Sequence, residues 1–245
     1  MSKKKKKNSN YYYGTEKENA PRGGAAVKKP LSKKAVISII VAAVLVIAVA
    51  LTITLCSLNR GADTRYAKID VKDHGIIIVQ LDAKTAPITV ENFLNLAKKG
   101  FYDGLTFHRI MDNFMIQGGC PDGDGTGGAD KDIFGEFSNN GHKNNISHKR
   151  GVISMAREGN QYNPSAAYNT ASSQFFICNA DSTFLDGDYA AFGWVISGMD
   201  VVDSITEYGI QHTSGGVIYN KSLQPVINSI VEITEAEALG YQSGK

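Results

Sequence analysis

Apolar residues follow three spacings along this chain, and each spacing predicts a different kind of structure. The first is an unbroken apolar stretch at 35–58, which has 24 residues, no charged side chain and mostly Val, Ile, Ala and Leu. As an α-helix it would be about 36 Å long at about 1.5 Å per residue, more than the roughly 30 Å of a hydrocarbon core. We therefore expect a transmembrane helix over 35–58.

Two other interpretations of this stretch are less favoured. Its hydroxyl side chains, such as Ser38, Thr52 and Thr54, do not form the polar stripe of a helix that packs on a globular core. A cleaved signal peptide has a shorter apolar region and a shorter leader. Cys56 would be the acylated residue of a lipoprotein, but Leu55 precedes it where that processing requires a small side chain. We expect an uncleaved anchor.

The second spacing is that of β-strands, and it begins after a short tether expected at 59–65. Tyr66–Asp70 and Ile76–Leu81 are rich in β-branched residues, and Asp73-His74-Gly75 between them is typical of a turn. These two segments therefore predict a pair of strands.

The third spacing is helical. Apolar residues share one face over Thr89–Lys99, with Pro87 just upstream and Gly100 at the end. A second helix is expected at Met199–Glu207, among short strands and Gly-rich turns. The pattern predicts a mainly β domain over 66–240, a closed antiparallel β-barrel capped by two α-helices and preceded by one transmembrane helix.

The distribution of charge divides the chain at the apolar stretch. Residues 1–34 carry +9, from eleven Lys and Arg against two Glu, whereas the whole chain carries +2 and the remainder therefore −7. This excess predicts a basic, disordered cytoplasmic tail, a single-pass cell-membrane protein and an extracytoplasmic domain. An acidic domain also argues against nucleic acid as a partner.

Two segments that combine polar and aromatic side chains predict a binding groove. Phe107-His108-Arg109, with the segment 114–119 after it, places one permanent cation beside apolar side chains and an amide. The segment 171–177 repeats the amide and phenylalanine chemistry some sixty residues later. Side by side, the segments would line a shallow apolar groove with an arginine at its rim. Such a groove suits a neutral ligand with one apolar ring and several amide dipoles, and proline in a peptide is that ligand.

Other chemistries fit the spacing poorly. Residues 123–128 satisfy G-x-G-x-x-G, but no apolar helical period follows them. A calcium loop starting at Asp122 would have Ile133 at position twelve, where Glu is needed. The five histidines are scattered without a pair at i and i+4, so we expect neither a metal nor a cofactor. Cys120 and Cys178 are expected to be free thiols.

The two groove segments resemble the cyclophilin family of peptidyl-prolyl cis/trans isomerases, here in a membrane-anchored form. The resemblance covers about Ala67 to Ile233 and implies a cyclophilin-like barrel that needs no cofactor. Further segments resemble the family in the same order: 101–104, 125–128, 151–156, 184–187, 191–193 and 201–203.

The resemblance also implies the roles of individual residues. It makes Arg109, Phe114 and Gln117 catalytic, with His108 packing beside the arginine. The remaining implied residues bind substrate: Met115, Gly125, Ala156, Arg157, Gln174, Phe176, Phe184, Leu185 and Tyr189. Phe114, Met115, Phe176 and Leu185 would form the proline pocket, although periodicity alone would equally place them in the barrel core.

Two functions follow from these residues. The first is an isomerase that acts on proline-containing peptides and assists the folding of unfolded exported proteins. The alternative is a non-catalytic proline-peptide-binding or holdase module, which has less need of Arg109. The loop Glu158–Ala171 borders the groove and is longer than in the shortest family members, so it either tunes which residues are accepted around proline or is a solvated insertion without effect.

Two positions depart from the family pattern. Phe184 stands where many members have Trp, and Tyr189 stands where they have His. Phe184 lacks the indole N–H that binds cyclosporin in the family, so we expect weak cyclosporin affinity and unimpaired peptide turnover. A binding titration should give tighter cyclosporin binding for Phe184→Trp than for the natural chain, and equal affinities would contradict this expectation.

Overall fold

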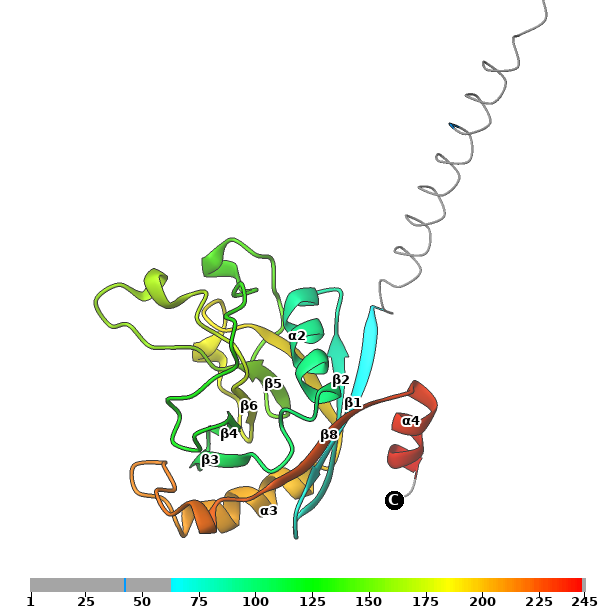
Figure 1. The fold of residues 1–245 in the computed structure, drawn as a ribbon, viewed down its shortest axis with the longest axis vertical. Helices are drawn as coiled ribbons and strands as arrows, with labels where there is room; N and C mark the ends of the chain where they lie inside the picture. Colours follow the sequence, from blue (N-terminus) through cyan, green and yellow to red (C-terminus); the bar gives the residue numbers. More distant parts are fainter. Residues whose placement is uncertain (1–41, 43–62, 244–245) are drawn as a thin grey trace, which may run out of the picture. The chain divides into compact units, whose positions relative to one another are not determined.

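The computed structural model describes residue 42 and residues 63–243 (Figure 1). The predicted cytoplasmic tail lies outside the described residues, as does the predicted transmembrane span apart from residue 42. None of the helices within the described part is both long enough and apolar enough to cross a membrane.

Eight strands form one sheet in the order β3-β4-β6-β5-β7-β2-β1-β8, and each neighbouring pair is antiparallel. The strands are β1 (Thr64–Val71), β2 (Gly75–Asp82), β3 (Thr106–Met111), β4 (Met115–Cys120), β5 (Val152–Met155), β6 (Phe175–Cys178), β7 (Ala191–Ser197) and β8 (Ile227–Ile233). The two strands predicted near the start of the domain lie within β1 and β2. Their turn needs left-handed backbone at Asp73, where φ is 62°.

The sheet curls until its edge strands approach each other, but the barrel closes only at one end. Thr106 of β3 pairs with Val226 just before β8, and the Gly104 N–H donates to the Ile227 carbonyl at 2.8 Å. Along the rest of β3, the segment 216–226 occupies the edge, where the Ile110 N–H donates to the Gly216 carbonyl at 2.7 Å. The predicted closed barrel is therefore a curled half-barrel, because this segment takes the hydrogen-bonding positions that β8 would need.

Two helices cap the sheet as predicted. They are α2 (Pro87–Lys98), which contacts β2 and β8, and α3 (Met199–Ile210), which contacts β2, β3 and β4. The first turn of α2 lacks a local side-chain cap, and the fully buried Glu136 serves instead. Its carboxylate accepts the N–H groups of Ile88 and Thr89 at 3.1 and 2.8 Å. A carboxylate is favourable there because the free N–H groups of a helix N-terminus carry partial positive charge.

A third helix, α4 (Glu235–Ser243), was not predicted. Its apolar period is weak, and Ala238 is its one buried residue. Thr234 and Glu237 form a capping box in which the Thr234 N–H donates to Glu237 Oε2 at 2.7 Å. The hydroxyl of Tyr66 also lies 3.2 Å from Glu235 Oε1, so polar contacts and a small apolar patch hold α4 against β1.

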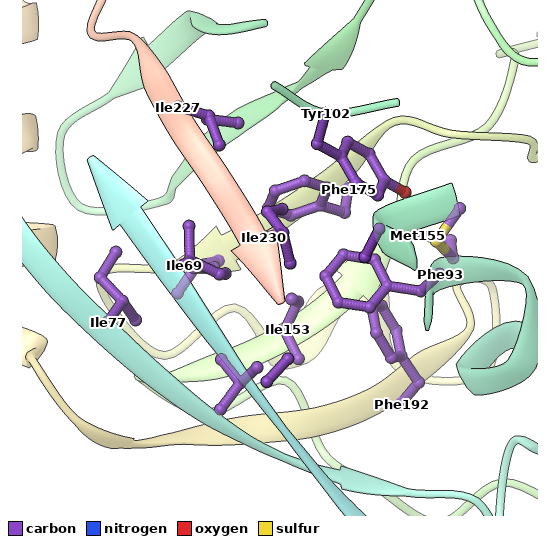
Figure 2. Close-up of a cluster of buried hydrophobic side chains, with 14 of the residues drawn as sticks. Ile69, Ile77, Phe93, Tyr102, Ile153, Met155, Phe175, Phe192, Ile227 and Ile230 are labelled. Atoms are coloured by element: carbon purple, nitrogen blue, oxygen red, sulfur yellow. The ribbon is translucent and has the colours of Figure 1, made fainter. Parts of the chain in front are cut away.

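An aromatic core connects α2 to the central strands (Figure 2). The Phe93 ring lies 5.4 Å from the rings of both Phe175 and Phe192 and 5.3 Å from that of Tyr102. All four rings are fully buried. This packing holds β6 firmly, and β6 presents the next residue, Phe176, on the opposite face of the sheet.

Candidate active site

Three long polar side chains form a hydrogen-bonded row across β3, β4 and the residue just before β6. Arg109 faces Gln117 in the β3–β4 register, and its Nη1 donates to Gln117 Oε1 at 3.1 Å. Gln117 Nε2 donates to Gln174 Oε1 at 2.9 Å. Gln174 Nε2 donates in turn to the carbonyls of Gly125 and Gly127 at 2.9 and 2.7 Å. Because a guanidinium can only donate, it determines the orientation of both amides in the row.

Arg109 is a half-buried cation without a carboxylate partner among the described residues. Its guanidinium lies 5.8 Å from the centre of the Phe114 ring, and Nη2 lies 3.0 Å from Met111 Sδ. Burial lowers the pKa of Arg109, and Tyr189 acts in the opposite direction. An arginine stays protonated at neutral pH, so this side chain keeps a positive charge and donor capacity at the edge of an apolar surface.

Beside Arg109 lies a small pocket of about 100 Å³ with an apolar floor. Its buried floor is made by Met115, Phe176 and Leu185, which form a cluster separate from the main core. Every lining residue belongs to the set expected from the sequence: Arg109, Phe114, Met115, Gln117, Ala156, Arg157, Phe176, Leu185 and Tyr189. The pocket is smaller than the roughly 300–1,000 Å³ of a typical small-molecule site, so it suits one ring-sized side chain.

The other three expected residues lie next to this pocket. Gly125 and Gln174 line a wider cavity of about 440 Å³, which Gln117, Ala156 and Arg157 also border. Phe184 lies at the rim, 71% exposed, with its ring 5.3 Å from that of Phe114. The predicted site residues therefore come together in one groove.

The loop Glu158–Ala171 contributes to the groove as expected from the sequence. Glu158 and Thr170 line the wider cavity, and the Glu158 N–H donates to Thr170 Oγ1 at 2.9 Å. This bond holds the two ends of the loop together at the groove, while Tyr162 in the middle of the loop is 99% exposed.

The side chain of Arg157 has a role that the sequence did not reveal. Its guanidinium lies over three aromatic rings, at 4.7 Å from Tyr189, 5.3 Å from Tyr168 and 5.6 Å from Phe137. Its Nε donates to the Asp188 carbonyl at 2.9 Å. Arg157 therefore connects one wall of the pocket to the 158–171 loop by cation–π contacts.

His108 lies in a bulge of β3 and is buried, in keeping with its expected structural role. Neither ring nitrogen has a hydrogen-bond partner among the described residues. Burial lowers its pKa to about 4, although Asp124 acts in the opposite direction. The ring lies against the 120–125 loop, where a Cβ added to Gly125 would be 3.4 Å from Nε2.

Acidification should destabilise the fold through His108. Its pKa falls from an ordinary 6.5 to about 4 on folding, so the unfolded chain binds the proton first as the pH drops. The stability lost between pH 6.5 and pH 4 is at most about 3 kcal/mol, and it is fully present above pH 6.5. Unfolding free energies measured from pH 4 to 7 should depend less steeply on pH for His108→Phe, whereas parallel profiles would contradict this cause.

The described cysteines and acidic residues offer no further reactive site. Cys120 and Cys178 are buried free thiols, and burial raises the pKa of Cys178 to about 12. Such a thiol is unreactive near neutral pH. Residues 63–243 contain no group of three or more His, Cys, Asp or Glu that could hold a metal ion.

The sequence of this chain is similar to those of known peptidyl-prolyl isomerases. The family "Cyclophilin type peptidyl-prolyl cis-trans isomerase/CLD" matches residues 66–235. A peptidyl-prolyl cis-trans isomerase of Helicobacter pylori is 43% identical over 164 residues, which cover 66% of this chain and 91% of that protein. Peptidyl-prolyl cis-trans isomerase B of Bacillus subtilis is 40% identical over 136 residues, which cover 56% of this chain and 87% of that protein.

Solved structures show the same fold. The crystal structure of a Cryptosporidium parvum cyclophilin type peptidyl-prolyl cis-trans isomerase aligns with a TM-score of 0.60 and 26% identity, covering 70% of this chain and 99% of that one. A second crystal structure of that protein, obtained in the presence of the dipeptide Ala-Pro, aligns with a TM-score of 0.59. The chain described here belongs to the cyclophilin-type peptidyl-prolyl cis-trans isomerase family, and its activity is peptidyl-prolyl isomerisation.

Proposed function

We propose that Arg109 is the catalytic electrophile, acting on a prolyl ring held in the adjacent pocket. A peptide bond resists rotation by about 18–20 kcal/mol because its nitrogen shares a lone pair with the carbonyl. In the twisted transition state the nitrogen recovers that lone pair and becomes a hydrogen-bond acceptor. A guanidinium aimed at this nitrogen then gains a partner that the planar ground state lacks, which is the differential binding that lowers a barrier.

The observation that carries this proposal is the isolation of Arg109 beside the pocket. The described residues provide no carboxylate partner for it, and Gln117 holds Nη1 at 3.1 Å. Phe114, Met115, Phe176 and Leu185 would bind the ring, and Tyr189 would close the pocket. The backbone of Ala156 and Arg157 and the side chain of Gln174 would hold the flanking peptide. A non-catalytic proline binder would have no need of a cation held at this position.

The hydrogen-bonded row from Arg109 through Gln117 and Gln174 allows a test of whether the orientation of Arg109 matters for catalysis. Gln117→Leu keeps a side chain of similar size but removes the amide that links Arg109 to Gln174. Because the amide only orients Arg109, kcat/KM for an Ala-Pro peptide should fall by about two- to ten-fold, less than the roughly 1.5–3 kcal/mol of a full hydrogen bond from a charged donor would give.

A matched control for that variant is Gln211→Leu, because Gln211 bonds only to the backbone of α3 in the described part of the chain. Its kcat/KM should stay at the natural value. Full activity in Gln117→Leu would show that the orientation of Arg109 does not depend on the row.

We also propose that the chain is anchored in a cell membrane and acts outside the cytoplasm on unfolded exported proteins. The support is the uncharged stretch at 35–58 and the +9 charge of residues 1–34 before it. Protease added to intact cells should remove the isomerase domain and leave a tag at residue 1 protected. Recovery of the intact chain in the soluble fraction would contradict the proposal.

A further inference from the structure

A second hydrogen-bonded row lies on the buried side of the proline pocket. His148 is 1% exposed, does not line the pocket, and stacks on Phe176, which does. The two rings are 6.0 Å apart and inclined by 17°. His148 Nε2 lies 3.0 Å from Ser154 Oγ, and Nδ1 lies 2.8 Å from Asp186 Oδ1. The row therefore runs from Ser154 through His148 to Asp186.

The partners determine where the proton of His148 resides. An ionised carboxylate only accepts hydrogen bonds, so Nδ1 facing Asp186 carries the hydrogen. Burial lowers the pKa of His148 below its ordinary 6.5, although Asp186 acts in the opposite direction, so the neutral form predominates at pH 7. Nε2 is then an acceptor, and the Ser154 hydroxyl donates to it.

Serine, histidine and aspartate in this order are also the components of a hydrolytic triad, but this row cannot act as one. Ser154 is fully buried, and it pairs with Phe176 in the β5–β6 register. A nucleophile must be able to reach its substrate, and Ser154 Oγ is not at a surface. The Ser154–His148–Asp186 row can therefore affect catalysis only by positioning the residues that it contacts.

His148 holds three walls of the pocket together. Ser154 belongs to β5, two residues before Ala156, and Phe176 belongs to β6. Asp186 directly follows the short helix η3 (Thr183–Leu185), and its Oδ1 also accepts the His148 N–H at 2.7 Å. One imidazole therefore spans the elements that carry Phe176 and Leu185 and the strand that directly precedes Ala156, and all three of these residues line the pocket.

We propose that His148 is a positioning residue for prolyl isomerisation, and that its neutral ring, held by Ser154 and Asp186, sets the spacing between Phe176 and Leu185. This inference rests on the proposal above that the pocket beside Arg109 holds the prolyl ring. It assigns the row a role in seating the prolyl ring and gives it no contact with substrate. Loss of the row should weaken proline binding more than it slows rotation, because Arg109 lies outside it.

Nitrogen NMR of the histidine rings in the full chain provides the first test. At pH 7 His148 should be neutral with its hydrogen on Nδ1, and its ring signals should shift when an Ala-Pro peptide saturates the site. A hydrogen on Nε2, a charged ring, or signals unchanged at saturation would overturn the proposal.

Variants of Asp186 test the link to catalysis. Asp186→Ala should lower kcat/KM at least about five-fold, mainly through a higher KM. Asp186→Asn should restore most of the loss, because its amide oxygen can still accept from Nδ1 and from the backbone. A mere loss of stability would not produce this separation of KM from kcat.

Asp181→Ala is the matched control. Asp181 accepts the Arg150 N–H at 2.9 Å, much as Asp186 accepts that of His148, but its other side-chain partner is Lys149 and it makes no bond to the His148 ring. Its kcat/KM should remain at the natural value. Natural activity in Asp186→Ala, or an equal loss in Asp181→Ala, would overturn the positioning role. Absence of isomerisation by the natural chain would instead contradict the proposed function itself.

Discussion

Arg109→Ala should lower kcat/KM for isomerisation of an Ala-Pro peptide by about ten- to a hundred-fold. A hydrogen bond from a charged donor contributes roughly 1.5–3 kcal/mol, and this one would form only in the transition state. The prolyl ring can still enter the pocket, so kcat should fall more than KM rises. A protease-coupled or NMR exchange assay on the full chain measures both constants.

Two further variants separate charge from geometry at this position. Arg109→Lys keeps the charge but loses the planar fork that bonds Gln117, so its activity should be intermediate. Arg65→Ala is the control, since Arg65 makes a surface ion pair with Glu232 away from the groove. An Arg109→Ala chain as active as the Arg65→Ala chain would mean that the rate enhancement comes from the pocket alone.

Phe175→Ala should cost about 3–5 kcal/mol of unfolding free energy, the largest stability effect that we expect from one substitution. The Phe175 ring is fully buried and packs edge-on against Phe93, Tyr102 and Phe107, with centroids 5.4, 5.7 and 6.0 Å away. Its removal leaves a cavity between α2 and the sheet. Chemical denaturation followed by circular dichroism gives the difference in free energy.

Phe184→Ala is the matched control for that experiment, because Phe184 is 71% exposed. Its unfolding free energy should change by less than about 1 kcal/mol. Similar losses in the two variants would show that the aromatic core does not dominate the stability of the domain.

The positions of β1, β2, α2 and α3 could be predicted because each has a local pattern. Alternating or helical spacing of apolar residues reports directly which face of an element is buried. The helix α4 could not be predicted in this way, since it buries Ala238 alone and is held by Glu237 and Tyr66. The extent of barrel closure was also missed, because a loop distant in sequence takes the edge of β3.

The residues of the groove were identifiable from the sequence, because Arg109, Gln117, Gln174 and Phe176 belong to recognisable segments. The order of the hydrogen bonds among these side chains was not identifiable from the sequence. Which of these side chains meet depends on the pairing of β3 with β4 and of β4 with β6.

The sequence by itself determined the mainly β class and the two capping helices, because these follow from spacing and residue type, while the resemblance to the cyclophilin family implied which residues share the groove. Only the tertiary structure decided that Arg157 lies against three aromatic rings and that His148 joins Ser154 to Asp186. These contacts join residues on separate elements, such as His148 and Asp186 at 2.8 Å. The spacing of residues along the chain carries no information about such contacts. They depend on how the whole sheet curls and on which distant side chains it brings within bonding distance.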